Sequence, residues 1–393
     1  YWRQLCAGGR YAGVQERGNQ AVLGGRCADH CGRAYHRKNS RRYQKRAAAR
    51  RRRNTIFIME IVLLLILAVV LFFVSKLSKI EKTKLDMDKI EVNEDISQES
   101  RKIMKGYQTI AMFGLDNRSN GNLSQGRSDV IMLANINNDT KEVKLVSVYR
   151  DTYLDTGDGI FQKCNAAYAK GGPEQAISML NVNLDLNITD YVTVDFNSII
   201  ECVDLLGGVD MEITDDEASL MTGYIRELNE LTGNKAENLT QGGTYTLNGV
   251  QACAYARIRY GGGDDYRRTE RQRTVLTAMV KKAQQSDLTT VNKLINEVCG
   301  DIQTSFSNAE LLALASQVFQ YSIGDTTGFP FTKTTRVLSK KTGDVVIPCD
   351  LSDNVKELHI FLYEDSAYTA SDTVKQNSEK IVSDTGFKSG DGH

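Results

Sequence analysis

The stretch ITDYVTVDFNSIIECVDLLGGVDMEI, residues 188–213, decides the fold class. Residues 188–196 alternate apolar and polar side chains in the way that a β-strand requires. Residues 197–208 then carry a helical pattern that ends at two glycines, and residues 209–213 alternate again. A strand, a helix and another strand in direct succession are typical of an α/β domain with a largely buried sheet.

Further strands and a helix are expected upstream of this stretch. Residues 109–116, TIAMFGLD, read as a short apolar strand, and residues 128–136 and 142–151 predict a hairpin around a turn at residues 137–140. Residues 172–184 begin with Gly-Pro and carry apolar side chains at helical spacing. With 393 residues, of which 41% are apolar, the chain can bury the core that such a domain needs.

A membrane anchor is expected ahead of the domain. The segment IFIMEIVLLLILAVVLFFV, residues 56–74, contains one ionisable residue, Glu60. At about 1.5 Å per residue it nearly spans a hydrocarbon layer of roughly 30 Å. A cleaved signal peptide is the alternative, but its apolar region usually has about 7–15 residues. We therefore expect one transmembrane helix over residues 55–75.

The charges around this segment predict its orientation. Residues 1–53 hold 15 Lys and Arg against 2 Asp and Glu, a net charge of +13, so the remaining chain sums to −13. Lys and Arg stay on the cytoplasmic side of a membrane. We therefore expect residues 1–54 to be a basic, disordered cytoplasmic tail and residues 76–106 to be a helical stalk outside the cell. Such a basic run could also bind nucleic acid or lipid head groups. We favour contact with membrane lipid and expect no nucleic-acid partner.

A second stretch, YARIRYGGGDDYRRTERQRT at residues 255–274, gathers six arginines around a glycine-rich turn. Residues 251–260 alternate as a strand would, which would place Arg257 and Arg259 on the same face. Residues 269–283 then have the apolar spacing of a helix. The turn would therefore join a strand that carries two arginines to the start of a helix.

The start of that helix is the expected position of an anion. Arg268 and Gln272 lie four residues apart and continue the apolar stripe of the helix toward its amino end. The helix dipole and the planar guanidinium groups favour a phosphate or pyrophosphate there over a single carboxylate. The alternative is a solvated charged face, with ion pairs to Asp264, Asp265 and Glu270.

Three short motifs place acidic and basic residues at the expected strand ends: GLDNR at 114–118, GRSD at 126–129 and YRD at 149–151. Asp116 and Asp129 supply hard oxygen ligands of the kind that Mg²⁺ uses together with substrate phosphates. Capping of a turn is the alternative role for either carboxylate.

With these motifs in order, the chain resembles the LytR-CpsA-Psr family of membrane-anchored cell-wall enzymes. The similarity covers roughly residues 107–285. The matching segments are GLDNR, GRSDVIMLANIN, SVYRDTYL, K-x-N-A-A-Y, LLGGVDMEI, L-N-G-x-x-A, YARIR and DYRRTERQ. The resemblance implies an α-β-α domain with a mixed central sheet over residues 107–305, followed by an extension with helices and a mobile tail over residues 306–393.

The resemblance also implies a reaction. A phosphate-linked anionic glycopolymer, such as a teichoic acid or capsular polysaccharide, would move from a polyprenyl-pyrophosphate carrier to peptidoglycan at the outer face of a Gram-positive cell membrane. The metal would be Mg²⁺, with Mn²⁺ as an alternative, held by Asp116 and Asp129. The pyrophosphate would be held by Arg127, Arg150, Arg257, Arg259, Arg268 and Gln272. The catalytic residues would be Asp116, Asp129, Arg150, Arg257 and Asp265, with Asp265 orienting arginines or taking a proton from the acceptor hydroxyl.

Two other functions remain open from the sequence. The same site would hydrolyse polyprenyl pyrophosphates if water replaced the sugar acceptor. A non-catalytic, polyanion-binding regulatory protein of the cell envelope would also need the arginines.

Two details complete the comparison with the family. The family usually has proline before the Arg-Asp pair, and here Tyr149 takes its place, so the loop that carries Arg150 loses a rigid φ angle. The family also holds its polyprenyl chain in an apolar tunnel. Candidate lining residues, for which ordinary core packing is the alternative, are Ile177, Leu180, Ile199, Val203 and Leu206.

Overall fold

The computed structural model describes most of the chain after residue 80. The described residues are 81–82, 85–115, 123, 126–259, 265–287, 289–290, 293–294, 302–307, 310, 313–314 and 317–392. Among them, no helix combines the length and the apolarity needed to cross a bilayer. The expected cytoplasmic tail, the expected transmembrane helix and Asp116 all lie outside the described residues.

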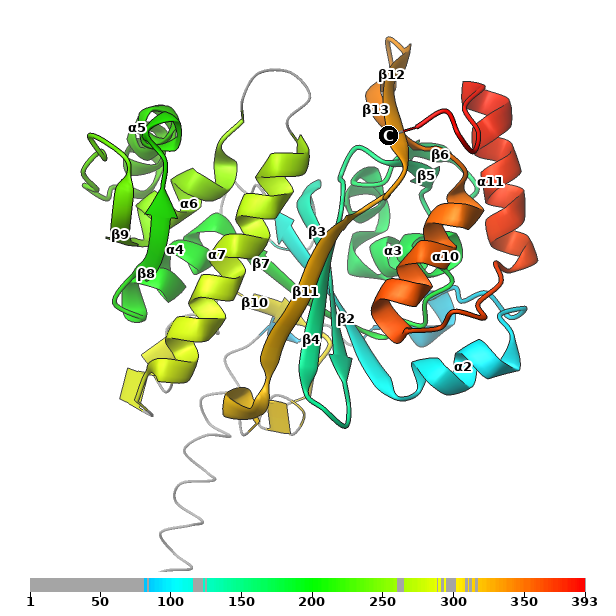
Figure 1. Ribbon diagram of the computed structural model, residues 1–393, viewed down its shortest axis with the longest axis horizontal. Coiled ribbons are helices and arrows are strands. Elements are labelled where there is room, and N and C mark those ends of the chain that lie inside the picture. The colour runs from blue at the N-terminus through cyan, green and yellow to red at the C-terminus, as the bar shows by residue number, and fades with distance from the viewer. Residues whose placement is uncertain are drawn as a thin grey trace, which may run out of the picture. The chain divides into compact units, whose positions relative to one another are not determined.

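A mixed β-sheet forms the centre of the fold (Figure 1). In spatial order the strands described are β1 (Glu81–Lys82), β10 (Ile302–Thr304), β7 (Asp190–Asp195), β2 (Tyr107–Leu115), β3 (Ser128–Asn137), β4 (Glu142–Val148) and β11 (Ser322–Phe329). The strands β2, β3 and β4 are antiparallel neighbours, whereas β2 runs parallel to β7 and β4 runs parallel to β11. The mixed sheet and the expected hairpin are therefore confirmed.

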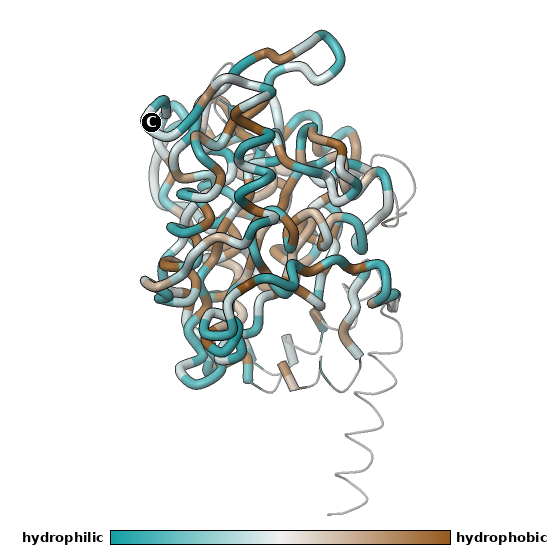
Figure 2. The backbone as a smooth tube through the Cα atoms, turned by 90° about the vertical axis from the view of Figure 1, so that its right-hand side faces the viewer, coloured by the Kyte–Doolittle hydropathy of each residue, from teal (hydrophilic) through white to brown (hydrophobic). Residues whose placement is uncertain are grey.

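Helices cover both faces of the sheet. Successive residues of a strand point to opposite sides, so one strand can bury apolar side chains under the helices of both layers. On β2, Ala111 and Phe113 pack into one core with α3 (Ala166–Leu184), α10 (Leu351–Tyr363) and α11 (Asp372–Thr385). Ile110 packs into a second core on the other face, beside Leu276 of α7 (Asp265–Gln285). The tube in Figure 2 shows the apolar segments inside the folded body and many polar segments on its surface. The three layers are those of an α-β-α domain.

The strand-helix-strand reading of residues 188–213 is correct in its elements but not in its sheet. The elements are β7, α4 (Phe196–Leu205) and β8 (Val209–Ile213). However, β8 pairs with β9 (Gly243–Leu247) in a separate two-stranded ribbon. Its inward side chains are buried while Asp210 and Glu212 are exposed, and a strand with one polar face cannot be covered on both sides. The ribbon packs instead with α5 (Asp215–Thr232) and α6 (Gly249–Arg257).

The strand expected over residues 251–260 is wrong, because these residues lie largely in α6. A capping box starts this helix: the Asn248 side chain accepts from the Gln251 N–H, and the Gln251 side chain accepts from the Asn248 N–H. The alternating pattern was misleading because residues 249–255 are all buried. Arg257 and Arg259 consequently do not share a strand face.

The stalk expected over residues 76–106 is also incorrect where this segment is described. Ile90, Ile96 and Met104 belong to the core under α3. The Asn93 side chain donates a hydrogen bond to the carbonyl of Val182 at 3.0 Å. This segment, which includes α2 (Gln98–Met104), therefore packs onto the domain.

The boundary expected at residue 305 does not separate two bodies. β11 is an edge strand of the central sheet, and α10 and α11 bury side chains in the same core as α3. The helices expected in the extension over residues 306–393 are present as α10 and α11. The expected mobile tail instead contacts the domain: Phe387 packs against the core, and Ser389 donates to Asp353.

Candidate active site

The expected site residues that the structure describes lie near one end of the strands of the central sheet. Leu115, at the end of β2, pairs with Ser128 at the start of β3 and with Asp195 at the end of β7. At the same edge, Val148 at the end of β4 pairs with Phe329 at the end of β11. The loop after β4 carries Arg150, and Asp129 is the second residue of β3. The chain topology therefore brings these two side chains together.

Arg150 is surrounded by three carboxylates. Its Nη1 donates to Asp129 Oδ1 at 2.6 Å, and its Nε lies 3.5 Å from Asp265 Oδ2 and 3.6 Å from Asp151 Oδ2. Burial disfavours the charged guanidinium, but the carboxylates outweigh burial and raise the pKa of Arg150. Arg150 is therefore held in place as a permanent cation.

Asp265, the first residue of α7, forms ion pairs with two arginines of residues 255–274. Its Oδ1 lies 3.4 Å from Arg259 Nη2 and 3.3 Å from Arg268 Nη2, and its Oδ2 faces Arg150. Burial raises the pKa of the Asp265 carboxyl, although Arg150 and Arg259 pull it down; Asp151 adds to the increase. Asp265 therefore contacts three arginines, and its raised pKa also suits a proton acceptor.

Several buried polar atoms of this cluster lack hydrogen-bond partners among the described residues. They are Arg150 Nε, Arg268 Nε, Arg268 Nη2 and Gln272 Oε1. Arg150 Nε and Arg268 Nη2 lie within ion-pair distance of Asp265, but neither contact has hydrogen-bond geometry. Arg268 is only 5% exposed. Buried donors in folded proteins are nearly always satisfied, and an unsatisfied group at a buried charge is costly. A cluster of unsatisfied arginine donors is the arrangement that an anionic ligand would complete. We call Arg150, Arg259, Arg268 and Gln272 the arginine cradle.

Arg257 and Arg127 lie outside this ion-pair network. Arg257 ends α6, pairs with Glu227 at 3.2 Å and lies over the rings of Phe196 and Tyr224. Phe196 directly follows β7, so Arg257 lies at the same edge of the sheet as the cradle. Arg127 is exposed in the residue before β3.

Reading the sequence did not separate structural arginines from site arginines. Arg271 Nε lies 3.1 Å from Glu217 Oε1, and both side chains are nearly buried, so this pair ties α7 to α5. Arg273 is 8% exposed, and its Nε and Nη1 have no hydrogen-bond partner among the described residues. Sequence reasoning also missed Lys163, which pairs with Asp151 at 3.0 Å. Its position at the start of the K-x-N-A-A-Y motif was the available signal.

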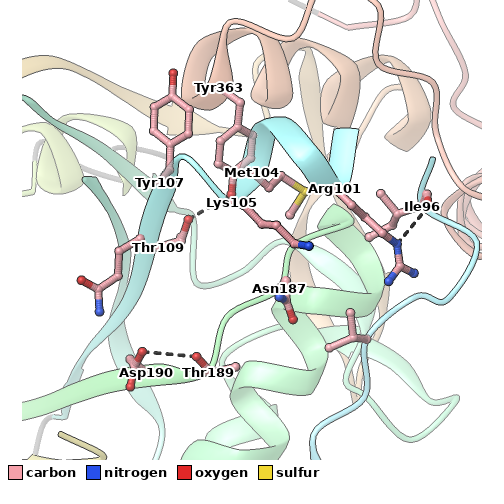
Figure 3. A pocket seen from close by; sticks show the side chains of 12 residues that line it. Ile96, Arg101, Met104, Lys105, Tyr107, Thr109, Asn187, Thr189, Asp190 and Tyr363 are labelled. Atoms are coloured by element: carbon pink, nitrogen blue, oxygen red, sulfur yellow. Dashed lines mark hydrogen bonds between the residues drawn. The ribbon is translucent and has the colours of Figure 1, made fainter. Parts of the chain in front are cut away.

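The proposed tunnel residues do not line a common space. Ile177 and Leu180 are fully buried in the core under α3, whereas Val203 belongs to the core around β8 and α6. Core packing is the observed role for these three. A cavity of about 350 Å³ lies at the opposite end of β2, around Tyr107, Thr109 and Tyr363 (Figure 3). It contains none of the residues of the arginine cradle.

Comparison with known proteins gives one consistent result. The model of the LytR_cpsA_psr family matches residues 67–336. The polyisoprenyl-teichoic acid–peptidoglycan teichoic acid transferase TagU of Enterococcus faecalis is 30% identical over 210 residues, which are 53% of this chain and 64% of that protein. The Bacillus subtilis transferase TagV is 30% identical over 195 residues, 48% of each chain. The Streptococcus mutans biofilm regulatory protein A is 31% identical over 208 residues, 50% of this chain and 49% of that protein.

Solved structures agree on the fold. The structure described as TagT bound to LI-WTA has a TM-score of 0.55 and 21% identity, covering 72% of this chain and 98% of that chain. Bacillus subtilis TagV has a TM-score of 0.52 and 25% identity, covering 68% of this chain and 99% of that chain. The aligned part spans between about half and two thirds of the curated relatives' length. Because the family model covers well over half of the sequence, including the arginine cradle, this chain belongs to the LytR_cpsA_psr family.

Proposed function

We propose that this protein transfers a phosphate-linked anionic glycopolymer, of the teichoic acid type, from a polyprenyl-pyrophosphate carrier to peptidoglycan during cell-wall assembly. The observation that carries the proposal is the set of buried, unsatisfied arginine and glutamine atoms around Asp265. The names of the curated relatives TagU and TagV support this reaction class.

The surroundings of the cradle suit an amphiphilic donor. Along α7, Arg268 and Gln272 are followed by Leu276, which packs against the apolar face of the sheet beside Ile110 and Leu145. A molecule with an anionic head and an apolar chain could place its head at the cradle and its chain between α7 and the sheet. Polyprenyl pyrophosphate has this composition.

The residues present account for the expected steps. The acceptor hydroxyl oxygen attacks the phosphorus atom that carries the glycopolymer, and the bond from that phosphorus to the bridging oxygen breaks, so polyprenyl phosphate leaves. Catalysis of such transfers consists mainly of positioning and of stabilising charge, which arginines provide. Asp265 would take the hydroxyl proton, and its raised pKa favours that role over a purely orienting one.

A divalent metal ion fits part of the site chemically. Within the described part of the chain, no three His, Cys, Asp or Glu side chains are grouped for metal binding. However, Mg²⁺ often uses one or two carboxylates and completes its shell with substrate phosphates and water. The Asp129 side chain is 26% exposed beside Arg150, so it could hold Mg²⁺ together with Asp116. When bound, Mg²⁺ would neutralise charge that develops on the pyrophosphate oxygens.

The proposal can be tested on the purified full chain in lipid nanodiscs. The substrates are a polyprenyl-pyrophosphate disaccharide and peptidoglycan oligomers, with and without Mg²⁺. We expect a phosphodiester-linked conjugate that forms only with Mg²⁺. The Arg268→Met variant should lose at least about a hundredfold in rate, whereas Arg267→Met, at an exposed neighbouring position, should retain activity.

Other outcomes would identify a different function. Release of disaccharide phosphate without a conjugate would indicate a hydrolase. Tight binding of the donor without any turnover would indicate a non-catalytic binding protein. Either result would overturn the transferase assignment.

A further inference from the structure

A pair of tyrosine rings lies directly beside the arginine cradle. Tyr149 precedes Arg150, and Tyr266 follows Asp265; their ring centroids are 4.6 Å apart with planes at 66°. Tyr149 is 7% exposed, and Tyr266 is partly exposed. Tyr149 is also the residue that stands where the family usually has proline. The ring pair therefore links the loop after β4 to the first turn of α7.

A lysine from the C-terminal part of the chain lies on these rings. Lys333 begins β12 (Lys333–Ser339), which forms a hairpin with β13 (Gly343–Pro348). Its Nζ lies 4.7 Å from the centroid of the Tyr266 ring and 5.5 Å from that of Tyr149. The same ammonium donates to the carbonyl of Phe331 at 3.2 Å. Figure 1 shows the hairpin at the same end of the fold as the start of α7.

The ammonium of Lys333 forms no ion pair with a described residue, although the charges of Asp265 and Asp344 act on the neighbouring Tyr266. Among the described residues, no carboxylate lies within ion-pair distance of its Nζ, and burial lowers the pKa of Lys333. Its ammonium carries three N–H donors, of which one bonds to Phe331. The neighbouring Tyr266 keeps its proton, because burial raises the pKa of its hydroxyl to about 12. The Lys333 ammonium and the Tyr266 hydroxyl are thus both donors, and the charges of Arg273 and Glu270 both act on Tyr149.

The direction of α7 indicates what part of a substrate reaches these donors. The helix passes from Leu276, on the apolar face, through Gln272 and Arg268 to Tyr266 in its first turn, a distance of about 15 Å at 1.5 Å per residue. A donor with its apolar chain near Leu276 and its pyrophosphate at the cradle would therefore extend its glycopolymer toward the amino end of α7, the end at which Tyr266 lies.

We propose that Lys333 and Tyr266, supported by Tyr149, form a second anion subsite that binds the first phosphodiester of the polymer beyond the pyrophosphate. We call these three residues the tyrosine-pair subsite. It rests on the proposed function, and it makes the enzyme selective for donors whose polymer carries a phosphate near the linkage sugars. The C-terminal hairpin thereby contributes to substrate recognition.

The test compares two donors that differ by one charge. One is polyprenyl pyrophosphate with a neutral disaccharide, and the other carries the same disaccharide extended by a single glycerol phosphate. Dissociation constants are measured for the full chain without acceptor, and kcat/KM is measured with acceptor. The variants are Lys333→Met, Lys333→Arg and the control Lys340→Met, in the exposed turn of the same hairpin.

We expect the wild-type protein to bind the extended donor more tightly than the neutral one. Lys333→Met should reduce this preference about tenfold, the usual effect of losing one charge-assisted hydrogen bond. Lys333→Arg should restore most of the preference, and Lys340→Met should leave it unchanged. The same ratios should appear in kcat/KM.

Two results would overturn the subsite. The first is that Lys333→Met weakens the binding of both donors equally, which would show that the lysine only holds the loop. The second is a wild-type protein that binds both donors alike. Failure of the proposed function would look different, because the protein would then form no conjugate from either donor. In that case the ratio of the dissociation constants of the two donors would still decide whether the subsite exists.

Discussion

Arg150 Nε and Asp265 Oδ2 lie 3.5 Å apart and connect the loop after β4 to the first turn of α7. These residues are 115 positions apart in the sequence. Through this contact, one carboxylate aligns arginines from the sheet, from the segment after α6 and from α7. The position of Asp265 therefore controls the geometry of the whole arginine cradle.

Replacing Asp265 with asparagine should impair turnover more than donor binding. The amide keeps the shape but cannot accept a proton, and such a loss typically costs about 10²–10⁴-fold. We expect kcat to fall in that range and the donor dissociation constant to change by less than about tenfold. Steady-state kinetics and direct binding assays separate the two quantities. An unchanged kcat would exclude Asp265 as the base.

The pH dependence of turnover should reflect the raised pKa of Asp265. A proton acceptor must be deprotonated, so the rate should fall as pH drops through the pKa in the folded protein. Because that pKa lies above the ordinary value for aspartate, the acid limb should begin at a higher pH than for an unperturbed carboxyl. The limb should disappear in Asp265→Asn. A pH profile of kcat that is flat in the wild type would contradict this assignment.

The same raised pKa has a consequence for stability. The neutral carboxyl is favoured in the folded state, so this group contributes most to folding below its unfolded pKa. That contribution is lost as pH rises through the folded pKa. The contribution of Asp265 to stability should therefore decrease as pH rises from its unfolded to its folded pKa, and the pH dependence of the unfolding midpoint should be smaller in Asp265→Asn. Thermal melts of both proteins across pH would test the sign.

Arg268→Met and Arg271→Met, three residues apart on α7, should differ in their effect on stability. Arg268 shares Asp265 with Arg150 and Arg259 and has donors that make no hydrogen bond, so Arg268→Met should lower the melting temperature less than Arg271→Met does, although donor binding should weaken. Arg271→Met leaves Glu217 buried without its partner and should destabilise the fold by about 3 kcal/mol. Urea unfolding of both variants gives the comparison. Equal destabilisation would mean that Arg268 is also a structural residue.

Gly328 should be intolerant of a side chain because of Tyr149. A Cβ at Gly328 would lie 2.1 Å from the Tyr149 hydroxyl, so Gly328→Ala must displace the ring and, with it, the loop that holds Arg150. We expect Gly328→Ala to reduce both turnover and stability. Adding Tyr149→Ala to this variant should restore part of both. A double-mutant cycle measures this coupling. Additive effects of the two substitutions would show that the ring and the glycine do not act together.

The C-terminal residues should be required for folding of the α-β-α domain. Asp185, fully buried at the end of α3, accepts hydrogen bonds from the Tyr368 hydroxyl and from the Ser371 N–H. Tyr368→Phe leaves part of that carboxylate unsatisfied and should cost about 1–3 kcal/mol. Chemical denaturation would measure this loss. The exposed Asp372→Asn serves as the control and should be near neutral.

Much of the fold and part of the site followed from the sequence because they depend on local patterns. The apolar residues in 109–116 and 128–136 predict strands, and the arginines around the glycine-rich turn and the helix start at Arg268 predict an anion site. The prediction failed at residues 251–260, because complete burial of a short helix removes the periodicity that separates helix from strand. Nothing local to Arg268 and Arg271 shows which of them faces a carboxylate on α5.

The sequence by itself determined the α/β class, the strands within residues 109–116, 128–136, 142–151, 188–196 and 209–213, the family and the concentration of arginines at one loop and helix start. Only the tertiary structure decided that Asp265 collects Arg150, Arg259 and Arg268, that Arg271 is a structural ion pair, and that Lys333 reaches the rings of Tyr149 and Tyr266. The physical reason is the range of the interactions. Periodicity and turn residues act between near neighbours, whereas the pairing of β4 with β11 and the burial of individual charges depend on segments far apart in the chain.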